Sequence, residues 1–268
     1  MKSNNYKILV LSDLKSATNS TLKSAVNLAK LVNGDLDFFH VKKATEIVST
    51  DSQLSAMRTI NESHTKTRVE IKQLLDSVSK EYDIKISRNH AFGNIKNEIS
   101  EYIKATNPDI IVIGQRKSRS FKIAKNSITD LVIKEHNGIT FVASEQNTFE
   151  PNKDFSLGVL NEVNGSNSKE LIDSLISQSS RPLKSFNISN TTDVADNNDS
   201  IAKKGSVNYV FEKSDNAIST ISNYLSKNNI DLLYLNKQGG IEKNSSDKNK
   251  FNIHEVITKM KTSLLIAS

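Results

Sequence analysis

A strand–loop–helix–strand pattern near the middle of the chain limits the folds that this sequence can adopt. It occupies residues 107–144, NPDIIVIGQRKSRSFKIAKNSITDLVIKEHNGITFVAS, with an apolar run at Ile110–Ile113, then Gly114, a basic loop, a helical pattern and a second apolar run at Thr140–Ala143. Continuous apolar runs are typical of strands buried on both faces, as in a parallel sheet. A loop at the carboxyl end of such a strand, leading into a helix N-terminus, is where α/β folds bind phosphate.

A fainter copy of this pattern closes the chain at residues 230–268. Asp109 and Asp231 each open a strand, and the sequences FVAS and LIAS each end one. A chain of 268 residues is long enough for two domains of ordinary size. We therefore predict two related domains, residues 1–146 and 154–268, joined by a short linker.

Alternating strand and helix patterns fill the rest of both halves. Five parallel-type strands separated by helices predict a three-layer α/β domain. The polar segment 189–206 lacks apolar periodicity and predicts a loop. Strands are expected at 6–11, 37–41, 84–92, 110–113, 140–143, 155–160, 183–188, 207–211, 232–235 and 264–267, and helices at 20–31, 52–82, 94–105, 127–136, 168–178, 216–227 and 254–260.

Composition excludes several classes of protein. The absence of cysteine excludes disulfides, thiolate metal sites and cysteine nucleophiles, and it fits a cytoplasmic location. No apolar run approaches the roughly 18 residues of a membrane span, and the run Ile8–Leu11 is too short for a signal-peptide core. We therefore expect a cytoplasmic protein that does not associate with membranes.

The net charge of +6 is a mild excess, typical of a solvated, lysine-rich surface. Nucleic-acid binding would need the positive charge on one face, and the loop after Gly114 has no interleaved aromatic residue apart from Phe121. Nucleic acid is therefore not an expected partner. The basic residues of that loop are Arg116, Lys117, Arg119, Lys122 and Lys125.

The sequence contains no recognisable catalytic constellation. The five histidines lack partners at metal-binding spacing, and neither a G-x-S-x-G elbow nor a Walker A motif is present. Asp13 alone does not make an acid–base pair. We therefore predict neither an enzyme nor a metal site.

Four pieces, in order, resemble the universal stress protein family: KILVLSD with its terminal Asp13, FFHVKK with Val41, the Gly93–Ile99 segment, and DIIVIG leading to NSITDLVIKEHNGITFVAS. The whole chain is similar to a tandem member. The resemblance implies an α/β fold of two tandem Rossmann-like, adenine nucleotide alpha hydrolase-like domains, each with a five-stranded, mostly parallel sheet.

The resemblance also implies a nucleotide site. The phosphate loop of ATP-binding members is similar to Gly-x-x-Gly, a spacer and Gly-Ser/Thr; here Gly114 takes the first place, Lys117 replaces the second glycine, and Asn126-Ser127 resembles the last pair. Glycine lets backbone amides approach phosphate without a Cβ in the way, so Lys117 obstructs the loop although its charge compensates in part. The candidate nucleotide contacts are Ser12, Asp13, Val41, Gly114, Arg116, Lys117, Asn126 and Ser127.

Each candidate also has a purely structural interpretation. Asp13 would be a charged strand end, Val41 a core residue, Gly114 a tight turn, the basic residues a solvated loop, and Ser127 a helix cap. Two functions therefore stay open. One is a stress-related module whose first half binds or senses ATP or another adenine nucleotide, with or without Mg. In this interpretation the second half is degenerate for nucleotide binding, because Asn236 stands where the glycine belongs. The other is a nucleotide-free scaffold for an unknown protein partner. In either case the last strands are expected to pair within the chain, and a homodimer of chains remains open.

Overall fold

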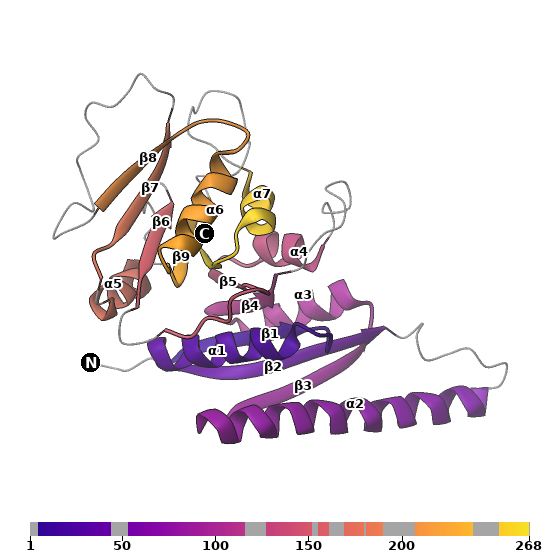
Figure 1. Ribbon diagram of the computed structural model, residues 1–268. Helices are drawn as coiled ribbons and strands as arrows, with labels where there is room; N and C mark the ends of the chain where they lie inside the picture. Colours follow the sequence, from indigo (N-terminus) through magenta and orange to yellow (C-terminus); the bar gives the residue numbers. More distant parts are fainter. Residues whose placement is uncertain are drawn as a thin grey trace.

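The ten strands in the part of the chain that the computed structural model describes lie in one sheet, in the order β3-β2-β1-β4-β5-β10-β9-β6-β7-β8 (Figure 1). The sheet is mostly parallel and has helices on both faces, which confirms the predicted α/β class. The structure describes residues 5–43, 53–115, 127–151, 155–160, 169–179, 181–189, 207–237 and 252–267.

The first half supplies five parallel strands, because its apolar runs pair in register with one another. Tyr6 of β1 pairs with Gly34 of β2, and Leu11 pairs with Ile113 of β4. The elements are β1 (Tyr6–Ser12), α1 (Thr18–Val32), β2 (Gly34–Lys43), α2 (Gln53–Tyr82), β3 (Ile86–Gly93), α3 (Ile95–Thr106), β4 (Ile110–Gly114), α4 (Ile128–Glu135) and β5 (Ile139–Ala143).

The second half repeats this order of strands in the sheet, with β9 between β6 and β10 as β4 lies between β1 and β5. Its strands are also parallel to one another. The polar segment predicted as a loop lies, from residue 190 to 206, outside the described residues. The elements are β6 (Leu157–Leu160), α5 (Lys169–Gln178), β7 (Lys184–Ser189), β8 (Val207–Glu212), α6 (Ala217–Lys227), β9 (Leu232–Asn236), α7 (Ile253–Lys259) and β10 (Ser263–Ala267).

The two halves meet where β5 and β10 pair antiparallel. Val142 lies opposite Leu264, and Phe141 lies opposite Leu265. Every residue of both strands is buried. The expected pairing of the last strands is therefore confirmed, and we call this antiparallel pair the seam.

Two apolar cores, one on each face of the sheet, hold the molecule together. The first core lies under α1, α2 and α5, and the second lies under α3, α4, α6 and α7. Each core contains residues of both halves, so packing runs across the seam without a break. Phe149 of the predicted linker belongs to the first core: its amide donates to Ser24 Oγ (2.9 Å), and its ring contacts Phe141 and Phe155.

The two aspartates that open strands have the same structural role. An Asp109 carboxylate oxygen accepts from the Lys7 amide at 2.8 Å, and an Asp231 carboxylate oxygen accepts from the Ser156 amide at 2.8 Å. Each carboxylate thus satisfies an amide just before, or at the beginning of, the neighbouring strand. This shared need explains why the sequence repeats an aspartate at both places.

Candidate functional site

The carboxyl ends of β1, β2 and β4 meet at one edge of the sheet, because these strands are parallel neighbours. Ser12 lies opposite His40 in the register, and Gly114 follows Ile113, the partner of Leu11. Ser12 and Gly114 are the last residues of β1 and β4 at this edge, and Val41 lies two residues before the end of β2. We call this edge of the sheet the candidate edge.

The turn after β1 is shaped by the side chains of Ser12 and Asp13. Ser12 Oγ accepts from the Leu14 amide (3.1 Å) and lies 3.0 Å from Thr18 Oγ1, while Asp13 Oδ1 accepts from the Lys15 amide (3.2 Å). Leu14 has a φ of 55°, in the left-handed region that side chains rarely adopt. The two predicted residues thus hold a turn with local backbone strain at the edge of the sheet.

His40 fixes the same turn from β2. Its ring is buried, and Nδ1 donates to the Ser12 carbonyl oxygen at 2.9 Å. Burial lowers the pKa of His40 below its usual value, so the ring stays neutral at pH 7. His40 is thus a packed side chain of β2. Val41 is also buried, and its side chain packs in the second core.

Gly114 lies in close contact with helix α1. A Cβ at this position would stand 2.6 Å from Thr21 Oγ1 of α1, and its φ lies outside the left-handed region. A glycine here therefore lets α1 lie close to β4. A ligand approach and a tight turn were the two reasons for this glycine that its sequence context suggested, and close packing of a helix is a third.

Gln115 attaches the beginning of the loop to the second half of the chain. Its amide donates to the Ala143 carbonyl (2.8 Å), and its side-chain Nε2 donates to the carbonyls of Ile257 (2.5 Å) and Met260 (2.7 Å) at the end of α7. No local motif marks Gln115, because the partners of its side chain lie more than a hundred residues away in the sequence. The remaining loop candidates Arg116, Lys117 and Asn126 lie outside the described residues.

Ser127 caps α4, and it does so together with Asp130. Ser127 Oγ accepts from the Asp130 amide (3.1 Å), while Asp130 Oδ2 accepts from the Ser127 amide (2.9 Å) and lies 3.1 Å from Ser127 Oγ. This reciprocal capping box was readable in the sequence as S-x-x-D. The other oxygen, Asp130 Oδ1, lies 2.9 Å from Nε2 of His254 on α7.

The second half has different residues at the positions that match Gly114 and Gln115. Asn236 takes the place of Gly114 and is buried, and Lys237 follows it where Gln115 stands in the first half. The Lys237 amide donates to the Ala267 carbonyl at 2.7 Å, as the Gln115 amide does to Ala143. Burial lowers the pKa of Lys237.

A hollow of about 290 Å³ lies at the opposite edge of the sheet, beside the amino ends of β1 and β2. It is bordered by Asp35, Asp37 and Thr106, among others, and Asp37 accepts from the Tyr102 hydroxyl at 2.5 Å. The hollow is therefore separate from the candidate edge. Within the described part of the chain, no group of three His, Cys, Asp or Glu residues is placed to hold a metal ion, and no helix there is long and apolar enough to cross a membrane.

Comparison with known proteins places these features in a family. Residues 5–137 match the model of the Universal stress protein family. The fold of the whole chain is similar to a universal stress protein from Archaeoglobus fulgidus DSM 4304 (TM-score 0.66, 15% identity, 98% of this chain and 96% of that chain). It is also similar to a protein of Pseudomonas aeruginosa UCBPP-PA14 described as belonging to that family (TM-score 0.54, 12% identity, 99% and 94%). No curated protein matches the sequence.

Proposed function

This chain belongs to the universal stress protein family, and from that membership we propose that its first half binds an adenine nucleotide at the candidate edge. Family membership supports a stress-related role. The proposed ligand is ATP or a related adenine nucleotide, with or without Mg, and the proposed role is regulatory: occupancy alters contacts with a protein partner.

One observation carries this proposal. Four separate segments that contain predicted contacts, at Ser12-Asp13, Val41, Gly114 and Ser127, end or begin around the carboxyl ends of neighbouring parallel strands. This is where open α/β sheets bind ligands. The α4 N-terminus adds backbone amides and a partial positive charge suited to phosphate, and the basic residues of 116–126 supply further positive charge.

Titration calorimetry of the whole chain with Mg-ATP tests the proposal, with ADP and AMP as comparison ligands. We expect micromolar binding at one site per chain. Lys117→Gly restores the missing loop glycine and is expected to tighten binding, whereas Lys227→Gly, at the end of α6 in the second half, is a control for loss of one surface charge. Absence of both heat and a thermal shift at millimolar ATP, in the wild type and in Lys117→Gly, would contradict the proposal.

A nucleotide-free scaffold is the second candidate. It is favoured by the structural roles found at the candidate edge: Gly114 makes room for Thr21, Gln115 binds α7, and Ser127 caps α4 with Asp130. Each of these structural roles accounts for the residue at its position without any bound ligand. The same titration separates the two candidates, because the scaffold predicts no response to any adenine nucleotide.

A further inference from the structure

Two histidines from different elements face each other between α2 and the edge strand β3. Nδ1 of His64 on α2 lies 3.4 Å from Nε2 of His90 on β3. Twenty-six residues separate the two in the sequence, so no local spacing marks them. His64 is exposed and His90 is half-buried, so solvent reaches both rings. We call these two residues the histidine pair.

The fold holds both rings of the pair in place. Alternate residues of a strand lie on one face, so Phe92 shares the face of His90 that is turned toward α2. The His64 ring lies against the Phe92 ring, with their centroids 3.7 Å apart. One turn further along α2, the buried Thr67 hydroxyl accepts from Lys42 Nζ of β2 at 3.4 Å. This part of α2 is therefore attached to the sheet beside β3 (Figure 1).

The separation of the two ring nitrogens fits two ligands of one metal ion better than it fits a hydrogen bond. At the usual zinc–imidazole distance of about 2.0–2.1 Å and a tetrahedral angle, two ligand nitrogens lie about 3.4 Å apart. Hydrogen bonds that N–H groups donate in proteins are mostly shorter, at about 2.7–3.2 Å. The two rings therefore already stand at the distance that a shared metal ion requires.

The surroundings of the pair decide which metal ions fit. The positive charge of Arg68 acts on His90, so charge attraction alone would not hold a cation there. His40 lies beside His90 in the register, but its Nδ1 is bound to the Ser12 carbonyl. Among the described residues, no third His, Cys, Asp or Glu completes a ligand set with the pair. Magnesium and calcium prefer oxygen ligands, whereas imidazole suits zinc, nickel and copper.

We propose that the histidine pair binds a divalent transition-metal ion such as zinc, nickel or copper, with water in the remaining coordination positions. The inference is independent of the proposed function, because the pair includes none of the candidate nucleotide contacts. A metal ion held by His64 and His90 would bridge α2 and the edge strand. It should therefore stabilise the folded chain increasingly as its concentration rises.

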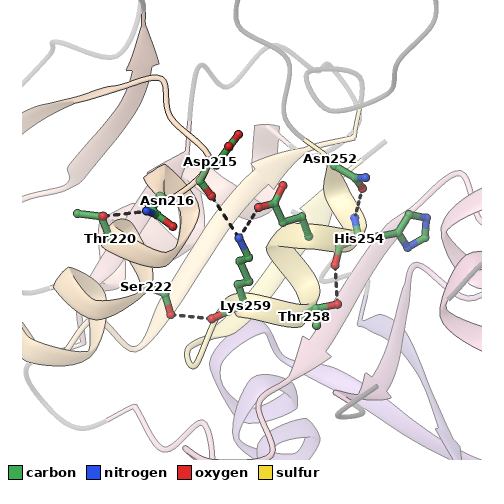
Figure 2. Close-up of polar contacts among 9 residues, drawn as sticks. Asp215, Asn216, Thr220, Ser222, Asn252, His254, Thr258 and Lys259 are labelled. Atoms are coloured by element: carbon green, nitrogen blue, oxygen red, sulfur yellow. Dashed lines mark hydrogen bonds and ion pairs between the residues drawn. The ribbon is translucent and has the colours of Figure 1, made fainter. Parts of the chain in front are cut away.

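Metal titration of the tag-free chain tests the proposal. Calorimetry with Zn²⁺, Ni²⁺, Cu²⁺ and Mg²⁺ gives Kd, and thermal unfolding with and without metal gives the shift in Tm. The variants are His64→Gln, His90→Gln and the double variant. The matched control is His254→Gln, at the start of α7, where the His254 amide donates to Asn252 Oδ1 at 2.9 Å (Figure 2). His254 Nε2 lies 2.9 Å from Asp130 Oδ1, so this control also tests a second pair of metal-type ligands.

We expect Cu²⁺ to bind more tightly than Ni²⁺ or Zn²⁺, and Mg²⁺ not to bind. His64→Gln and His90→Gln should each weaken zinc binding by at least about tenfold. The double variant should lose little more, because a single remaining ring cannot chelate the ion. Zinc should raise the Tm of the wild type and of His254→Gln, but not the Tm of the pair variants. Because His64 is exposed, His64→Gln should keep the fold, which circular dichroism without metal verifies.

Three results would overturn the inference. The first is that zinc, nickel and copper all fail to bind the wild type at millimolar concentration. The second is an unchanged zinc affinity in a folded His64→Gln variant, which would leave the pair as a long hydrogen bond. The third is loss of zinc binding in His254→Gln in place of the pair variants, which would assign the metal to His254 and Asp130.

Discussion

Thr21 of α1 and Gly114 of β4 are packed so closely that a Cβ on Gly114 would stand 2.6 Å from Thr21 Oγ1. Gly114→Ala should therefore lower the free energy of unfolding by about 1–3 kcal/mol, as overpacked cores do. Thr21→Ala removes the clashing oxygen, so the double variant should recover much of that loss. Urea unfolding of the four proteins measures this coupling. Additive losses would contradict it.

The same relationship decides how the candidate edge should be tested. A valine at position 114 would bring a branched side chain against Thr21 Oγ1, so Gly114→Val is expected to disturb the packing of α1 as well as the loop. Loss of binding in that variant would follow from local unfolding as readily as from a blocked loop. The double variant Gly114→Ala/Thr21→Ala is the better probe, because the smaller side chain at position 21 makes room for the added methyl group at position 114.

Phe149 connects the cores of the two halves. Its ring centroid lies 5.6 Å from that of Phe141 and 6.1 Å from that of Phe155, and its side chain is 2% exposed. Phe149→Ala should lower the free energy of unfolding by about 3–5 kcal/mol. Phe149→Leu, which fills more of the space, should lose less. Denaturant unfolding checks the order, and a loss below about 1 kcal/mol for the alanine variant would show that the ring is not a core residue.

Gln115 should control the stability of the α7 end. Gln115→Leu removes the donor to the Ile257 and Met260 carbonyls and should lower the free energy of unfolding by about 1–3 kcal/mol. Hydrogen exchange should become faster in residues 253–260. The matched control is Gln178→Leu, which removes a more exposed amide contact to the Leu31 carbonyl. Equal, small effects of the two substitutions would contradict a special role for Gln115.

The stability of the protein should decrease as the pH falls from about 7 to about 5. Burial lowers the pKa of His40, His90 and His136 in the folded chain, whereas unfolded histidines titrate near pH 6.5. As the pH falls, the unfolded state therefore takes up protons first, and the free energy of unfolding decreases. Urea unfolding at several pH values measures the slope.

A histidine variant separates the contribution of the histidines to this pH dependence from the contribution of the carboxylates. His136→Gln should flatten the slope between pH 7 and pH 5, because one group with a lowered pKa is gone. A wild-type profile that is level or rises over this interval would contradict the prediction.

Much of the fold was readable in the sequence, because strands buried on both faces are continuous apolar runs. The predicted strands at 110–113 and 232–235 match β4 and β9 to within one residue at each end. β2 was predicted at 37–41 and extends over Gly34–Lys43. Its ends pair with Tyr6 and Gly93, so neighbouring strands, and not local composition, set its length.

The site was less readable, because several of its contacts cross the seam. Ser12, Asp13 and Ser127 were identified through motifs local to their own turns. Gln115 and His254 bind partners that only the pairing of β5 with β10 brings near. The nucleotide contacts themselves stay a prediction until a ligand is titrated.

The seam also changes how this protein can evolve. In a symmetric dimer of identical chains, one substitution alters both subunits at once. Here β5 and β10 belong to different parts of one chain and are encoded separately. One half can therefore have Gly114 while the other has Asn236 at the matching position. Within one chain, the two halves can therefore carry different residues at matching positions, which two identical subunits cannot do.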